Sequence, residues 1–327
     1  MIRAATRTIG AILSFGTAVA LASPMQAPTI TEWTVPWQQT RPRDPWLHGG
    51  NVWFVGQRGD YVGRFDPVGE TFRQYPLAEG AGPHTVIVDD RGAWYAGNRQ
   101  QHIGLVDPDS GAITRFPLPG KGPRDSHTMA FTRGGDIWFT VQGGNQLGFL
   151  DTESGDIELY DIATPGARPY GLIVVDDSPW ATLFGSHRLV SWRQGGLHEI
   201  VLPREQARPR RLAATVDGAI WYVDYAEGYL GRYQPETGEV SEWRAPAAGM
   251  SRPYAMASDS KGRLWFVETG VTPNRLVGFD PATETFTEPA PIPSGGGTVR
   301  HMYYDADTNS LWFGTDTNTL GRAELPE

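Results

Sequence analysis

The chain has 327 residues and no cysteine, which excludes disulfide staples, thiol chemistry and zinc sites of the cysteine type. Its formal net charge is −9 at pH 7. Because an acidic surface repels phosphate groups, neither nucleic acid nor anionic lipid is an expected partner. The 40 glycines, 26 prolines and 11% aromatic residues are typical of many short strands joined by tight turns.

The start of the chain differs in composition from the rest. Arg3 and Arg7 precede an apolar run over residues 9–21, and small residues follow, including Ala22 and Ala27. This order is typical of a secretory signal peptide. The run is too short to span a bilayer, so we expect an exported protein, periplasmic or secreted, without membrane insertion. Loss of Arg3 and Arg7 with the peptide would move the net charge from −9 to −11.

Seven tryptophans recur along the chain at nearly even spacing. Their separations are 41, 44, 42, 41, 44 and 47 residues. A period of this length indicates a propeller, a solenoid or an array, and short alternating strands favour the propeller. The seven are Trp53, Trp94, Trp138, Trp180, Trp221, Trp265 and Trp312. We expect them to be packed between neighbouring sheets as core residues, and not to form a ligand cage.

Each repeat contains two predicted hairpins. In the second repeat, residues 85–88 run into a turn and residues 93–96 return, and residues 102–106 and 113–118 form the second pair. The sequence therefore predicts an all-β fold, a seven-bladed β-propeller whose blades are four-stranded and antiparallel.

The chain ends indicate how the ring closes. After the last predicted third strand at residues 319–323, too few residues remain for another strand. Residues 30–36 read Ile-Thr-Glu-Trp-Thr-Val-Pro and match the fourth strand at residues 240–246, which reads Val-Ser-Glu-Trp-Arg-Ala-Pro. We therefore expect the amino-terminal strand to complete the last blade and cover two sheet edges. The predicted organisation is a signal peptide at 1–27 and one monomeric propeller domain at 28–327.

The candidate site lies where the inner strands begin. In an antiparallel pair, the start of the first strand and the end of the second lie on the same face of the ring. Aligned by the tryptophans, the residues at the starts are Arg43, His84, His127, Tyr170, Arg210, Tyr254 and His301, and those at the ends of the second strands include Gln57, Asn98, Gln142, Asp224, Glu268 and Asp316. Such convergent polar groups predict a pocket for a small or peptide-like ligand.

A solvated lining of a water-filled channel is the alternative explanation for these polar positions. Three of the seven histidines share the register, which favours a site, because histidine can act as a base or a metal ligand near neutral pH. The histidines His102, His187 and His198 fall on third strands or outer positions, and we expect them at the surface. No local histidine spacing indicates a metal, so any metal site would be assembled across blades.

The longest repeated phrase is Arg-Pro-Tyr-Ala at 252–255, Leu-Trp-Phe-Val-Glu at 264–268 and Leu-Val-Gly-Phe at 276–279. It resembles the virginiamycin B lyase (streptogramin B lyase) family of seven-bladed propellers, over the whole mature chain. The resemblance implies an elimination that opens the ester of a cyclic depsipeptide, with magnesium. It implies His301 as the base and Asp316 as an acid that orients the substrate or binds the metal. Among the acids at the strand ends, Glu268 is a further candidate metal ligand. Two family positions differ, since Val299 replaces an acid and Tyr254 replaces a histidine.

Three hypotheses follow. The first is a lyase-like propeller that binds or opens a small cyclic ester or peptide-like ligand at the face of His84, His127, Tyr254 and His301. The second is a non-catalytic propeller that binds a protein or a glycan. The third is a calcium-dependent, lactonase-like hydrolase that uses Glu268, Asn98 and Asp224.

Overall fold

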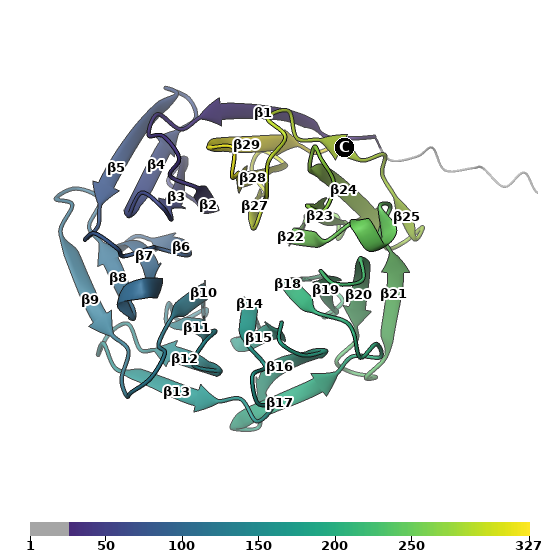
Figure 1. Ribbon diagram of the computed structural model, residues 1–327, viewed down its shortest axis with the longest axis horizontal. Coiled ribbons are helices and arrows are strands. Elements are labelled where there is room, and N and C mark those ends of the chain that lie inside the picture. Colours follow the sequence, from purple (N-terminus) through teal and green to yellow (C-terminus); the bar gives the residue numbers. More distant parts are fainter. Residues whose placement is uncertain (1–25) are drawn as a thin grey trace, which may run out of the picture.

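The computed structural model describes residues 26–327, and the predicted signal peptide therefore lies almost entirely outside the described residues. Seven antiparallel sheets surround a central axis, which confirms the predicted seven-bladed β-propeller (Figure 1). Two short 3-10 helices, η1 (Asn98–Gln100) and η2 (Ala248–Met250), lie in loops. No helix among residues 26–327 is long and apolar enough to cross a membrane.

The first four blades each have four strands in chain order. Their bounds are β2 (Pro42–His48), β3 (Asn51–Gly56), β4 (Tyr61–Asp66) and β5 (Thr71–Pro76); β6 (Val86–Asp89), β7 (Gly92–Gly97), β8 (His102–Val106) and β9 (Ile113–Pro117); β10 (Ser126–Phe131), β11 (Ile137–Val141), β12 (Gln146–Leu150) and β13 (Ile157–Asp161); and β14 (Pro169–Val175), β15 (Ser178–Leu183), β16 (Arg188–Arg193) and β17 (Gly196–Val201).

The last three blades show two departures from this plan. Blade 6 has two short segments in place of one outer strand, and blade 7 borrows its outer strand from the start of the chain. The bounds are β18 (Pro209–Ala214), β19 (Ile220–Asp224), β20 (Tyr229–Tyr233) and β21 (Val240–Arg244); β22 (Pro253–Ser258), β23 (Leu264–Glu268), β24 (Arg275–Asp280), β25 (Thr285–Phe286) and β26 (Ala290–Pro291); and β27 (Met302–Asp305), β28 (Ser310–Gly314), β29 (Thr319–Glu324) and β1 (Thr29–Thr34).

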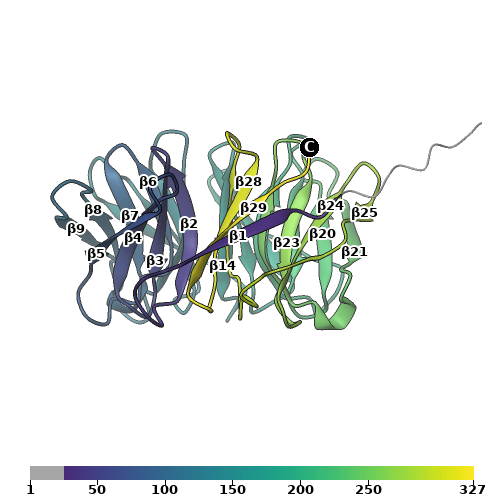
Figure 2. The ribbon, with the colours of Figure 1, turned by 90° about the horizontal axis from the view of Figure 1, so that it is seen from above.

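Strand β1 closes the ring, as predicted. It pairs antiparallel with β29 from Thr29 opposite Glu324 to Thr34 opposite Thr319. Figure 2 shows β1 crossing the outside of blade 7. The side chain of Asn318 extends the closure, because its amide donates to the carbonyl oxygens of Val35 and Trp37 at 3.0 and 2.8 Å.

The core lies between neighbouring blades. All seven repeat tryptophans are at most 6% exposed, which confirms them as core residues. Glycine recurs in the third strand because an aromatic side chain of the second strand covers it: a Cβ on Gly63 would lie 2.4 Å from Phe54, and one on Gly104 would lie 2.2 Å from Tyr95. In blade 4 the glycine is replaced by Val190, and its partner is the small Ala181.

The inner strands are irregular where they begin. Pairing of β2 with β3 shifts register between Arg43 and Trp46, and four other blades show the same shift. Such a bulge breaks the alternation of side chains and re-aims them. As a result, the successive residues Arg43 and Asp44 are both buried near the axis.

Candidate functional site

A cavity of about 300 Å³ opens where the inner strands begin, and we call it the mouth. Its lining residues are Arg41, Arg43, Gln57, His84, Asn98, His127, Gln142, Arg168, Tyr170, Phe184 and Arg210. Five of the seven residues predicted at the strand starts are among them, together with Gln57, Asn98 and Gln142 from the strand ends. Tyr254 adjoins this group, since its hydroxyl hydrogen-bonds that of Tyr170 and its ring lies 3.8 Å from the Arg210 guanidinium.

The rings of two histidines and a tyrosine lie in contact along one wall of the mouth. The ring centroids of His84 and His127 are 3.4 Å apart, and those of His127 and Tyr170 are 4.1 Å apart. Burial lowers the pKa of His84 and of His127 well below the ordinary value, and nearby Arg43 and Arg211 lower both further. Both imidazoles are therefore neutral at pH 7, so they supply hydrogen-bonding and stacking groups without a charge.

Arg210 lies inside a group of aromatic rings. Its guanidinium carbon is 4.2 Å from the ring centroid of Tyr225 and 4.6 Å from that of Phe184. Burial alone would raise the pKa of Tyr170, but the positive charges of Arg210 and of the nearby Arg43 and Arg211 outweigh it and lower the pKa to about 8. Burial raises the pKa of its hydrogen-bonded neighbour Tyr254.

Below the mouth, a buried ionic network crosses the axis, and we call it the plug. Arg211 of blade 5 donates to Asp44 of blade 1 at 3.0 Å, to Thr128 of blade 3 at 3.1 Å and to the carbonyl of Arg300 at 3.0 Å. Asp44 also accepts from Arg43 at 2.8 Å. Burial opposes ionisation of Asp44, but Arg43 and Arg211 hold its pKa far below the usual range.

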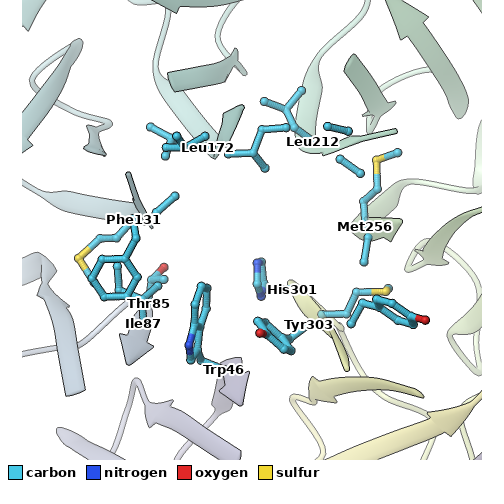
Figure 3. Close-up of a pocket in the computed structure, with 18 of the residues that line it drawn as sticks. Trp46, Thr85, Ile87, Phe131, Leu172, Leu212, Met256, His301 and Tyr303 are labelled. Atoms are coloured by element: carbon cyan, nitrogen blue, oxygen red, sulfur yellow. The ribbon is translucent and has the colours of Figure 1, made fainter. Parts of the chain in front are cut away.

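A second cavity of about 430 Å³ lies on the other side of the plug, and we call it the chamber. Its walls are mainly apolar and include Trp46, Phe131, Leu172, Leu212, Met256 and Tyr303 (Figure 3). His301 lines the chamber, not the mouth, and its Nδ1 atom is buried without a hydrogen-bond partner. Burial and the nearby Arg211 lower the pKa of His301 to about 3.

The two predicted metal ligands are both held by arginines. Asp316 lies beside the mouth, 2.8 Å from Arg300 and 3.4 Å from Arg41, and Glu268 is fully buried against Arg275. A hard cation needs several free oxygen ligands. In residues 26–327, no group of three His, Cys, Asp or Glu side chains is placed to hold a metal ion. This donor set does not fit magnesium.

Two further positions bear on the metal hypotheses. Val299, which stands where the resemblance places an acid, packs in an apolar cluster with Trp265 and Phe313, so a carboxylate there would enter the core. Asp224 is fully buried and paired with Arg204 at 2.8 Å, whereas Asn98 lines the mouth. The structure therefore does not bring Glu268, Asn98 and Asp224 together as free calcium ligands.

Sequence reasoning missed the plug and misplaced two histidines, His301 and His102. Asp44, Thr85, Thr128 and Arg211 each follow a predicted mouth residue by one position, so the same alignment moved one step shows a polar residue in four of the seven blades. His102 was expected at the surface, but it is buried and its Nε2 atom lies 3.0 Å from the Tyr95 hydroxyl. The physical reason is that its ring covers Gly97, its partner in the second strand, which has no side chain to displace it.

Comparison with known proteins supports the family that the sequence phrase suggested. A streptogramin B lyase structure is 24% identical over 93% of this chain and 100% of its own, with a TM-score of 0.83. A catalytically inactive histidine variant of virginiamycin B lyase from Staphylococcus aureus, solved with quinupristin, is 23% identical over 91% of this chain and 100% of its own, with a TM-score of 0.82. An extracellular domain from a one component system of B. thetaiotaomicron is 15% identical over 89% of this chain and 39% of its own, with a TM-score of 0.67.

These likenesses show the fold. A search of curated proteins gave no significant match. The Virginiamycin B lyase family model matches residues 20–187, which is more than half of the chain. The chain belongs to the virginiamycin B lyase family.

Proposed function

We propose that this protein is exported and binds a small cyclic-ester or peptide-like ligand at the mouth. The observation that carries the proposal is a cavity of about 300 Å³ lined by side chains from several blades, with buried polar atoms that have no partner. Ligand pockets combine such a volume with a few well-placed polar groups.

The burial of the mouth residues argues against a simple solvated channel. Arg43, His84 and His127 are at most 5% exposed, so bulk water does not surround them. The plug lies directly beneath, because Asp44, Thr85 and Thr128 each follow one of these residues in the chain. Buried polar residues at this level of the axis would limit a through-flow of solvent, which suits a bound ligand.

Ester-opening elimination is a second candidate function, favoured by the unpartnered Nδ1 atom of His301 in the chamber. In that reaction the neutral imidazole would take a proton from the carbon next to the ester-bearing carbon. The C–O bond would then break, leaving a C=C bond and a free carboxylate. A pKa of about 3 makes His301 a weak base at neutral pH, and Asp316 lies outside the chamber. We therefore propose ligand binding as the primary function and ester opening as the second candidate.

A ligand screen tests the proposal. Cyclic depsipeptides, simple lactones and linear peptides are titrated by calorimetry into wild type, His127→Gln and His301→Ala. We expect His127→Gln to weaken binding by about tenfold or more, since it removes a stacked ring from the mouth, and His301→Ala to leave binding unchanged. The opposite pattern would place the ligand in the chamber, and no binding by any compound would refute the proposal.

Mass spectrometry of the mixtures tests turnover and export. Elimination leaves the mass of the ligand unchanged although the ring opens, whereas hydrolysis adds one water. Loss of ring opening in His301→Ala with unchanged binding would establish His301 as the base. For export, we expect the mature protein to begin near Ser23 or Pro28, and an intact Met1 on cytoplasmic protein would contradict it.

A further inference from the structure

The arginines of the mouth have no acidic partner within its lining. Arg41, Arg43, Arg168 and Arg210 all line the cavity, and no described lining residue is an aspartate or glutamate. The chain as a whole carries a net charge of −9, so this local excess of positive charge opposes the overall balance. A cluster of like charges in a pocket is costly unless a ligand or counter-ion neutralises it.

The nearest carboxylates are already engaged by other cations. Asp44 accepts from Arg43 but is shared with Arg211 of the plug, at 3.0 Å. Asp316 lies 3.4 Å from Arg41 but is bound more closely by Arg300, at 2.8 Å. Within residues 26–327, Arg168 and Arg210 have no acidic side chain within ion-pair distance. The mouth therefore keeps a net positive charge.

Buried guanidinium donors remain unused. The Nη2 atom of Arg43 and the Nε atom of Arg210 are buried and have no hydrogen-bond partner. The Nε atom of Arg43 donates to Asp44 at 2.8 Å, and its Nη1 atom reaches only the neutral amide of Gln57, at 3.2 Å. A planar guanidinium presents paired donors that match a carboxylate or phosphate oxygen pair, and these charge-assisted bonds are stronger than neutral ones.

The remaining wall suits the organic part of a ligand. Phe184 and Tyr170 line the cavity next to Arg210, and their rings lie 5.6 Å apart between centroids at an angle of 44°. The neutral rings of His84 and His127 continue this surface. An inorganic ion would leave these ring faces uncovered, whereas a ring attached to the anion would pack on them.

We propose that the mouth binds a small organic carboxylate, with the anion held by Arg43 and Arg210 and an apolar or aromatic portion against Phe184 and Tyr170. This inference rests on the proposed ligand-binding role of the mouth and specifies its substrate class. Guanidinium groups provide the positive charge, so binding needs no metal ion.

The test compares matched probes on the complete mature protein. Phenylacetate is titrated by calorimetry against its neutral analogue phenylacetamide, and inorganic phosphate and sulfate are titrated separately. We expect phenylacetate to bind, phenylacetamide to bind at least tenfold more weakly, and sodium chloride to weaken the phenylacetate complex by screening. Addition of a chelator should not change the affinity.

Four variants test where the site lies. Arg210→Gln should weaken phenylacetate binding by about tenfold or more, and Arg210→Lys should restore part of that loss because it keeps the charge. If Arg210→Gln folds poorly, phenylacetate binding is measured with Arg168→Gln, a change at an exposed lining residue. Arg73→Gln, on the exposed face of the outer strand β5, makes the same change of charge far from the mouth and should have no effect.

The outcomes separate the two proposals. Equal binding of phenylacetamide and phenylacetate would overturn the carboxylate site but leave a ligand-binding mouth. Binding of phosphate without phenylacetate would assign the arginines to an inorganic oxyanion and also overturn it. If no anion binds while a neutral cyclic ester or peptide does, the carboxylate site fails and the proposed function stands.

Discussion

The mouth and the chamber are built from the same inner strands, yet their chemistry is opposite. On β2, Arg43 lines the mouth and Trp46 lines the chamber, and on β18 the corresponding pair is Arg210 and Leu212. A shift of two or three positions along each strand thus separates a polar, arginine-rich pocket from an apolar one. The comparison teaches that the two ends of a propeller channel can carry cavities of different chemistry.

The plug keeps the two ends apart. Asp44 and Arg211 come from opposite parts of the ring and meet at 3.0 Å in a layer that is almost fully buried. His301 belongs to the chamber side of this layer, and the other two histidines of its register belong to the mouth side. A single sequence register therefore supplies residues to two different environments.

The largest expected effect comes from opening the ring, which would remove both cavities at once. Deletion of residues 29–36 takes away β1 and leaves the edge of β29 unpaired. We expect the melting temperature to fall by about 10 °C or more, because the change costs several kcal/mol, or the protein to aggregate through the free edge. Thr31→Ala is the control, since the exposed side chain is lost but the backbone pairing with Arg322 remains. An unchanged melting temperature in the deletion variant would contradict the closure.

The next largest expected effect comes from breaking the plug between the mouth and the chamber. Arg211→Met removes the cation that joins Asp44 to Thr128, and breaking a buried ion pair typically lowers the free energy of unfolding by about 3–5 kcal/mol. Urea denaturation measures the change. Arg133→Met, at a side chain that is 75% exposed, should stay within about 0.5 kcal/mol. A change in Arg211→Met as small as the control would show that the plug does not stabilise the ring.

A smaller expected effect is the contribution of the mouth residue His84 to the pH dependence of stability. The pKa of His84 is lowered in the folded protein, so below about pH 6.5 the unfolded chain takes up a proton that the folded chain does not. Stability should therefore fall with falling pH, by about 1.4 kcal/mol per pH unit for this residue. His84→Gln should reduce that slope, measured as the unfolding free energy between about pH 6 and pH 5. His198→Gln, exposed on the outer strand β17, should leave it unchanged, and an identical slope in both variants would refute the assignment.

The smallest signal is spectroscopic and compares one tyrosine from each end. Tyr170 in the mouth has its pKa lowered to about 8, whereas burial and the nearby Asp305 and Asp307 raise the pKa of Tyr303 in the chamber. Ultraviolet titration should show one early tyrosinate among the 12 tyrosines. Tyr170→Phe should abolish this early step, and Tyr303→Phe should retain it. Persistence of the step in Tyr170→Phe would remove the charge argument for the mouth.

The sequence predicts the fold almost completely because the fold repeats. Three signals predict the backbone directly: the seven repeated tryptophans, the regular hairpins, and the match between residues 30–36 and 240–246. Each signal is local or occurs several times. The blade 6 outer strand, split into β25 and β26, is an exception without a repeated signal.

The site is less predictable, because side chains from different blades decide it. The sequence identifies Arg43, His84, His127, Tyr170 and Arg210 as a group, and all five line the mouth. It does not show that the bulges at the strand starts send Asp44 and Arg211 into a shared layer, nor that His301 lies beyond it. Pairing of Asp316 with Arg300 also depends on local backbone geometry that no spacing reports.

The closure by β1 also orders events during synthesis. The chain makes β1 long before its partner β29, and Glu32 and Thr319, which hydrogen-bond across the closure, are 287 residues apart. Contacts between such distant residues form slowly, so the ring can be sealed only after the final blade has emerged. An incomplete chain would keep unpaired edges at both ends and remain open to proteases and chaperones. The pairing of β1 with β29 therefore distinguishes a finished ring from a truncated, open one.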